Sequence, residues 1–84
     1  MFYRKSKLFN LAKIDGIFYI STGLKSYEVN EIGARIFDLC NGENREDDII
    51  EKIAIRFSKT NNEIREDVQQ FIAQMFELKI IEKA

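Results

Sequence analysis

The hydrophobic pattern of this chain changes its period at Asn30, and that change limits the folds the chain can adopt. Before Asn30, residues 17–20 (IFYI) form a β-branched and aromatic run that is typical of a strand. After it, Ile32, Ile36 and Cys40 recur every four residues, which is the spacing of one helix face. Strands therefore precede helices along the chain, and this order predicts an α+β fold.

The strand region, about residues 7–29, is expected to form a three-stranded antiparallel meander. Asp15-Gly16 is a strong hairpin signal, placed between the first strand and the apolar second strand. The second strand is apolar on both faces, so we expect it in the centre of the sheet. The third strand, at residues 24–29, mixes polar and apolar side chains, so we expect it to be the exposed edge.

Three helices are expected to follow, each bounded by residues that favour helix ends. Asn30 can cap the first helix through its side-chain oxygen, and Asn41-Gly42 can end that helix with a left-handed residue. Asn44 can cap the second helix, and Thr60 can help to cap the third. We interpret residues 1–84 as a single domain with a winged-helix-like order, β-β-β-α-α-α, and with helices at about residues 31–41, 45–58 and 62–78.

The residue types that carry most enzyme chemistry are scarce in this chain. Its 84 residues include no histidine, which is the commonest general base and metal ligand. A single cysteine, Cys40, excludes an intramolecular disulfide, a zinc cluster and a CxxC motif, and its apolar helical setting indicates a core residue. The four glycines stand far apart, so they form no phosphate-binding loop. We therefore expect a non-catalytic domain without cofactor or metal.

The charge distribution bears on nucleic acid and membrane partners. The formal net charge of −1 gives no strong field toward either partner. DNA binding is still an alternative for a winged-helix order, and a general protein–protein adaptor is another. The helix in the recognition position opens with Glu63, Glu66 and Asp67 and a single base, Arg65, whereas docking on DNA requires Lys and Arg. We therefore expect no binding to nucleic acid.

The chain also lacks the sequence features of exported and membrane-spanning proteins. No segment has the apolar region and cleavage site of a secretory signal, and no apolar run is long enough to span a bilayer. One free cysteine is typical of a reducing compartment. These features predict a cytoplasmic protein that does not bind membranes.

The stretch YEVNEIGARIFDLCNGEN, Tyr27 to Asn44, resembles the PqqD-like family, the RiPP recognition elements of peptide natural-product biosynthesis. The shared pattern is an aromatic residue, an aliphatic residue and a helix-capping Asn, here Tyr27, Val29 and Asn30, followed by a small Gly33. Further positions that match this pattern are Ile36, Phe37, Leu39, Gly42, Ile49, Ile53, Asp67, Val68, Phe71, Ile72, Met75, Leu78 and Ile80.

This resemblance implies a peptide-binding module with no chemistry of its own. Proteins of this family hold the leader region of a ribosomally made precursor peptide and present it to a partner. That partner is a peptide-modifying enzyme, such as a radical-SAM maturase, or a lasso-type leader peptidase. The leader is expected to add as a strand to the third strand and to rest in the groove between it and the third helix. An exposed edge also invites a second copy of the chain, so a homodimer stays open.

The residues expected to bind the peptide lie on the third strand and the third helix. The strand supplies unpaired backbone N–H and C=O groups, and the broad apolar face of the helix supplies pockets. Asp67 and Gln74 are expected to set the register of the peptide through polar contacts. The expected peptide-binding residues are Leu24, Lys25, Ser26, Tyr27, Glu28, Asp67, Phe71, Ile72, Gln74 and Met75.

Several of these residues also have a plainer interpretation. Phe71, Ile72 and Met75 fit an ordinary core position, and Asp67 fits a solvated first-turn residue. The charges on the third strand fit residues that prevent edge-to-edge aggregation. Tyr27 and the neighbouring Val29 are expected to point inward and to help build the groove wall.

Overall fold

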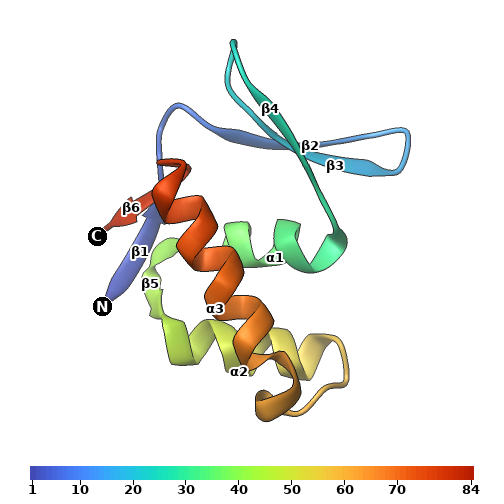
Figure 1. The fold of residues 1–84 in the computed structure, drawn as a ribbon, viewed down its shortest axis with the longest axis vertical. Helices are drawn as coiled ribbons and strands as arrows, with labels where there is room; N and C mark the ends of the chain where they lie inside the picture. The colour runs from blue at the N-terminus through green and yellow to red at the C-terminus, as the bar shows by residue number, and fades with distance from the viewer.

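In a computed structural model, which describes residues 1–84, six strands and three helices surround a shared hydrophobic core (Figure 1). The elements are β1 (Phe2–Lys5), β2 (Asn10–Ile14), β3 (Ile17–Ser21), β4 (Ser26–Val29), α1 (Glu31–Leu39), β5 (Asn41–Arg45), α2 (Glu46–Arg56), α3 (Asn61–Glu77) and β6 (Ile81–Lys83). They form two sheets, of order β2-β3-β4 and β5-β1-β6. The first lies at one end of the molecule, and the second lies where the two termini meet (Figure 1). The α+β class is confirmed, as is the meander followed by three helices.

The β2-β3-β4 sheet is built from two tight hairpins with β3 in the centre, as the sequence predicts. Asp15 and Gly16 have φ angles of 51° and 81°, which suit the left-handed turn that joins β2 to β3. The second turn is closed by a hydrogen bond of 2.8 Å from the Thr22 N–H to the Lys25 carbonyl. Thr22 Oγ1 also accepts from the N–H groups of Leu24 and Lys25, so this turn is fixed by one side chain.

The predicted starts of the two outer strands need correction. β4 begins at Ser26 rather than at residue 24, because Leu24 and Lys25 belong to the turn that Thr22 closes. Leu24 is 97% exposed there. β2 begins at Asn10 rather than at residue 7, after a turn at residues 7–8. The meander is therefore shorter than the hydrophobic pattern indicates.

The β5-β1-β6 sheet is absent from the sequence-based prediction. Its central strand β1 pairs antiparallel with β6 and with β5, so it joins both ends of the chain to the connection between α1 and α2. Arg4 lies opposite Glu82, with 3.5 Å between Nε and Oε1. Residues 41–45 (NGENR) carry no apolar side chain, so no period-two pattern indicates β5. Gly42, with φ 84°, lies where the register of β1 with β5 is irregular.

The first helix begins where the sequence predicts and ends earlier. Asn30 caps it, because Asn30 Oδ1 accepts a hydrogen bond of 2.7 Å from the Gly33 N–H. α1 ends at Leu39, whereas Asn41-Gly42 was expected to end it. Those two residues instead open β5, whose pairing with β1 draws the chain out of the helix.

The N-cap of α2 is also displaced by β5. Arg45 occupies the cap position, and its N–H donates to the Asp48 carboxylate at 2.8 Å. Asn44, the expected cap, is instead a buried residue of β5. Its amide donates to the carbonyl of the last α1 residue at 3.0 Å, and its Oδ1 accepts from Lys52 Nζ at 2.6 Å. Asn44 therefore ties the end of α1 to α2 rather than capping a helix.

The third helix has the N-terminus that the sequence predicts. The side chains of Thr60 and Glu63 exchange hydrogen bonds with each other's backbone N–H, at 3.1 and 3.2 Å. The hydrogen bond from the Thr60 N–H to the carboxylate, together with the Thr60 side chain, holds the pKa of Glu63 below its usual value. α3 then runs from Asn61 to Glu77, within one residue of the expected bounds, whereas α2 ends at Arg56, two residues early.

The core draws apolar side chains from all three helices and both sheets. Cys40 is fully buried within it, which confirms the core interpretation of this residue. Burial raises the pKa of its thiol to about 12, so the group stays protonated and is a poor nucleophile. The buried core residues are Ile20, Ile36, Phe37, Cys40, Ile49, Ile50, Ile53, Ala54, Ile64, Val68, Ile72, Met75, Ile80 and Ile81.

Candidate functional site

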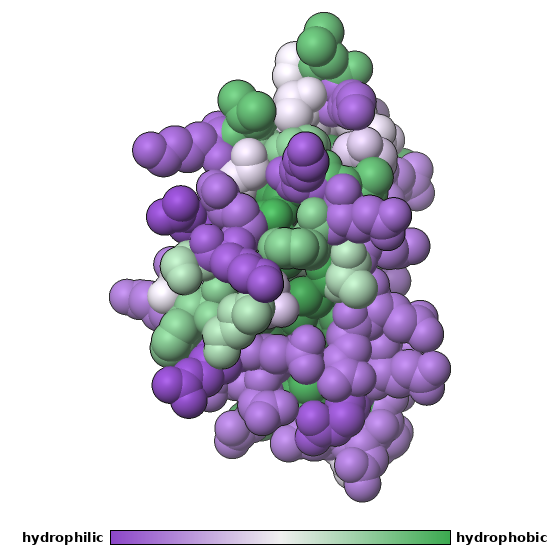
Figure 2. Space-filling model, turned by 60° about the vertical axis from the view of Figure 1, so that its left-hand side comes forward, coloured by the Kyte–Doolittle hydropathy of each residue, from purple (hydrophilic) through white to green (hydrophobic).

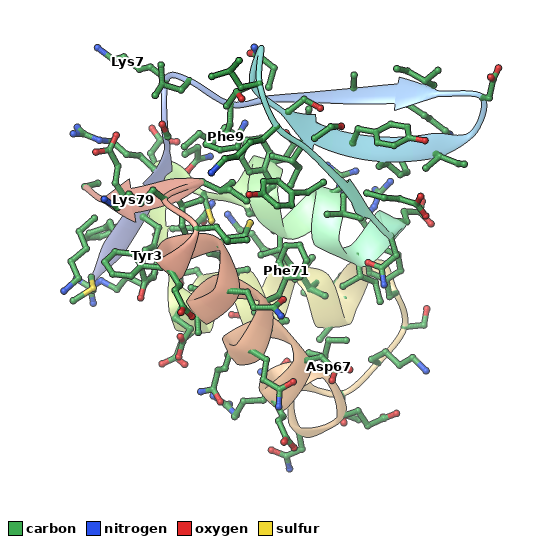
Figure 3. The ribbon with its side chains drawn as sticks, turned by 45° about the horizontal axis from the view of Figure 1, so that its top comes forward. Tyr3, Lys7, Phe9, Asp67, Phe71 and Lys79 are labelled. Atoms are coloured by element: carbon green, nitrogen blue, oxygen red, sulfur yellow. The ribbon has the colours of Figure 1, made fainter.

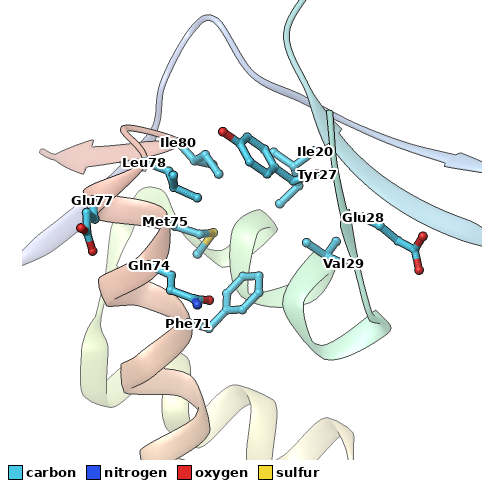
Figure 4. A pocket seen from close by; sticks show the side chains of 10 residues that line it. All are labelled: Ile20, Tyr27, Glu28, Val29, Phe71, Gln74, Met75, Glu77, Leu78 and Ile80. Carbon is cyan, nitrogen blue, oxygen red and sulfur yellow. The ribbon is translucent and has the colours of Figure 1, made fainter. Parts of the chain in front are cut away.

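A groove of about 430 Å³ lies between β4 and the C-terminal half of α3 (Figure 4). Its deeper part includes two fully buried side chains, Ile20 of β3 and Ile80, which precedes β6. Seven of its ten lining residues are hydrophobic, so the groove suits apolar side chains. The lining residues are Ile20, Tyr27, Glu28, Val29, Phe71, Gln74, Met75, Glu77, Leu78 and Ile80.

One edge of β4 has no partner strand. β4 is the outer strand of its sheet and pairs only with β3. In an antiparallel ladder, hydrogen-bonded and non-hydrogen-bonded pairs alternate. Since the Thr22–Lys25 pair next to β4 is hydrogen-bonded, Ser26 and Glu28 occupy non-hydrogen-bonded positions. Their backbone N–H and C=O groups therefore point away from β3, toward the open edge.

The side chains of β4 alternate between the two faces of the sheet. Ser26 and Glu28 are exposed, whereas Tyr27 and Val29 are half-buried and line the groove. The ring of Tyr27 lies against that of Phe9, with 6.4 Å between the centroids. This packing holds Tyr27 at the rim beside the open edge, as Figure 4 shows. The inward orientation expected for Tyr27 and Val29 agrees with this alternation.

The opposite wall depends on a close contact between α3 and α1. Phe71 extends from α3 toward α1 (Figure 3) and lies directly on Gly33. A Cβ atom at Gly33 would lie 2.6 Å from Phe71 Cζ, which is closer than real side chains approach. Glycine at this position therefore lets the Phe71 ring settle between the two helices. Met75, one turn further along α3, is buried and closes the groove from below.

The structure brings half of the predicted peptide-binding residues into the groove lining. These five residues are Tyr27, Glu28, Phe71, Gln74 and Met75. They come from β4 and α3, which are separated by residues 30–60 in the chain and which the fold places face to face (Figure 4).

The other predicted residues lie elsewhere. Ser26 is on the open edge of β4, and Leu24 and Lys25 are in the turn before it. Asp67 is exposed one turn before Phe71, on the same side of α3 but outside the lining. Ile72 is buried and faces a separate hollow on the other side of α3, with Tyr3 and Phe76. Figure 2 shows apolar side chains gathered across one face of the molecule, with hydrophilic side chains around them.

Five lining residues were not among the expected peptide-binding residues: Ile20, Val29, Glu77, Leu78 and Ile80. Of these, Val29 was expected only as part of the groove wall. Leu78 and Glu77 follow Gln74 at intervals of four and three residues, so helical spacing could have identified them. Ile20 and Ile80 gave no comparable signal, because they reach the groove only through the packing of β3 and β6 on the helices.

The charges of the groove are acidic and unpaired. Glu28 and Glu77 are the charged residues of the lining, and neither belongs to any of the three ion pairs of the protein.

No three of the Cys, Asp and Glu side chains are grouped as a metal site would require. None of the helices combines the length and the apolar character that a bilayer crossing demands. The site as built can hold an extended apolar segment.

Comparisons with known proteins agree with this architecture. The family model described as Coenzyme PQQ synthesis protein D (PqqD) matches residues 17–81, which include β3, β4, all three helices and the whole groove lining. The chain belongs to the PqqD family. The resemblance inferred from its sequence is thereby confirmed.

A solved structure with the same PqqD-like fold is that of TbiB1 in complex with the TbiA(beta) leader peptide. It is 18% identical in sequence, the match covers 96% of each chain, and the TM-score is 0.76. Because the match covers almost the whole chain, the solved structure shows that the fold extends through β1 and β2, before the region that the family model matches. No curated protein matches the chain.

Proposed function

We propose that this protein is a recognition element that binds the leader region of a ribosomally made precursor peptide by strand addition. The peptide pairs with the open edge of β4 and places its side chains in the groove beside α3. The protein then presents the peptide to a peptide-modifying enzyme or a leader peptidase, of the radical-SAM or lasso type. The single observation that carries this proposal is the open β4 edge directly beside an apolar groove.

The chemistry of strand addition fits the two parts of the site. The backbone groups of Ser26 and Glu28 offer hydrogen bonds to any extended peptide, without regard to its side chains. Alternate side chains of an added strand point to the same face, so every second residue would enter the groove. The groove volume of about 430 Å³ accommodates a few apolar side chains rather than a whole folded partner.

Membership of the PqqD family supports this function, since the family is named for a protein of coenzyme PQQ synthesis. The solved structure of the same fold was obtained with a leader peptide bound, which supports the same class of ligand here. The acidic opening of α3, with Glu63 followed by Glu66 and Asp67, gives no support to docking on DNA.

A titration followed by backbone amide shifts tests the proposal. The ¹⁵N-labelled protein is titrated with the synthetic leader of a precursor peptide identified among the neighbouring genes, and separately with duplex DNA. We expect shifts that concentrate in residues 26–29 and 71–78, and none with DNA. If those residues do not move while DNA binds tightly, the proposal is wrong. Sedimentation without peptide shows whether a second copy occupies the same edge.

A substitution on the open edge tests strand addition directly. In Ser26→Pro the outward N–H is missing, and its loss should weaken leader binding about fivefold while the fold is retained. Ser26→Ala is the matched control. It removes the 2.9 Å contact between the hydroxyls of Ser21 and Ser26 but keeps the N–H, so its affinity should match that of the wild type. Unchanged affinity in a folded Ser26→Pro variant would argue against pairing through this residue.

A further inference from the structure

Two carboxylates flank the groove, and no basic residue lines it. Glu28 comes from β4 and Glu77 from α3. Figure 4 shows them at opposite sides of the apolar lining, with the Glu28 carboxylate on the face of β4 that is turned away from Tyr27 and Val29. Neither carboxylate has a basic group within 4 Å, although Lys79 follows Glu77 by two residues. Both carboxylates are therefore free to pair with a ligand.

The position of Glu77 adds to this negative potential. It is the last residue of α3, and the last turn of that helix contains no basic residue. The C-terminus of a helix carries a partial negative charge, so a carboxylate there is unfavourable and a cation is favourable. Leu78, which caps this end, also lines the groove, so the negative end of the helix lies at the site itself.

From these features we infer that the peptide that fills the groove is cationic, with Lys or Arg placed beside its large apolar residues. The apolar side chains of the peptide enter between Tyr27 and Phe71. Its alternate side chains lie on the outer face of the sheet, where a basic one meets Glu28, and another basic side chain reaches Glu77 at the far rim. This inference rests on the proposed function and specifies the class of peptide. An acidic peptide of the same apolar content would meet two unpaired carboxylates and bind more weakly.

Selection from a peptide display library tests the inference without knowledge of the native leader. The probe is a library of random 12-residue peptides, selected on the full chain and on a Glu28→Gln, Glu77→Gln double variant. The matched control is Glu43→Gln, Glu51→Gln, which removes two charges from exposed side chains of β5 and α2 outside the groove. Amide spectra of both variants establish that the fold is intact.

We expect the wild type and the control to enrich peptides that combine aromatic or aliphatic residues with Lys or Arg. The groove variant should keep the apolar preference and lose the basic one. The dissociation constant of a selected basic peptide should rise about 2- to 5-fold for each carboxylate removed. Raising the salt concentration should weaken the binding of that peptide to the wild type more than its binding to the groove variant.

The possible outcomes distinguish a failure of this inference from a failure of the proposed function. Selected apolar peptides without basic enrichment, which still shift the amides of β4 and α3, would overturn the inference and leave strand addition standing. Equal loss of basic enrichment in the control and groove variants would also overturn it, since only net charge would then matter. If the wild type selects no peptide, or only peptides that shift residues outside the groove, the proposed function fails and the inference with it.

Discussion

The two sheets of this protein differ in how far apart in the chain their strands are and in whether those strands line the groove. The β5-β1-β6 sheet joins segments from both ends and the middle of the chain, and Ile81 of β6 is buried in the core. The β2-β3-β4 sheet joins neighbouring segments through two turns, and its outer strand β4 has an open edge that lies beside the groove. Each sheet gives a buried side chain to the core, Ile81 and Ile20, but only the sheet with local pairing has strands that line the groove.

The largest expected effect is a loss of unfolding free energy at a buried position of the β5-β1-β6 sheet. Ile81→Ala removes a side chain that is 1% exposed, so it should lower the free energy of unfolding by about 2–5 kcal/mol. Ile17→Ala, in β3, removes a side chain that is 39% exposed and should cost less than about 1 kcal/mol. Urea denaturation measures both values. Equal costs would contradict the difference in burial between these two positions.

A smaller effect is expected where α1 meets α3, at the wall of the groove. In Gly33→Ala the new methyl group meets Phe71 at 2.6 Å, so the ring must move, at a cost of about 1–3 kcal/mol. The groove wall moves with it, and affinity for a leader peptide should fall. Gly23→Ala is the control, because a Cβ atom there meets nothing within 4 Å and should change stability by less than about 1 kcal/mol. Similar unfolding energies for the two variants would contradict the close contact.

The smallest effect is a pH dependence at the junction of α1 and β5. Burial raises the pKa of Cys40 from 9.0 to about 12, so between these values the unfolded chain loses a proton that the folded chain keeps. Stability should therefore fall as the pH rises from 9, by about 1 kcal/mol per unit. Urea denaturation at pH 8, 9 and 10 measures the slope, with Cys40→Ala as reference. Parallel slopes for the two proteins would show that the thiol ionises equally in both states.

The parts of the fold that the sequence predicts are those with a local physical cause. Asp15-Gly16 sets its turn through backbone conformation alone, and Asn30 caps α1 through an atom three residues away. β5 has no such cause, because it becomes a strand only through pairing with β1, about 40 residues earlier. No local pattern reveals that pairing. The displaced cap at Asn44 follows from the same pairing.

The residues of the candidate site also fall into those that local spacing predicts and those that depend on tertiary packing. Helical spacing places Phe71, Gln74 and Met75 on one side of α3, and all three line the groove. The apolar face of α3 is too broad for its pattern to tell which wall each residue faces, so Ile72 was grouped with them although it lies on the other side. Ile20 reaches the groove through tertiary packing, which no short-range pattern encodes.

The pairing of β1 with β6 also determines how the protein responds to force. The strands are antiparallel, and Tyr3 lies opposite Lys83 at the outer end, followed inward by Arg4 with Glu82 and Lys5 with Ile81. A pull on both termini in opposite directions loads the outermost pair first and then each pair in turn. The paired residues would separate one pair after another, rather than all at once as in strands that are pulled along their length. The pairing that joins the two ends of the chain is thus the first part of the fold to open under tension.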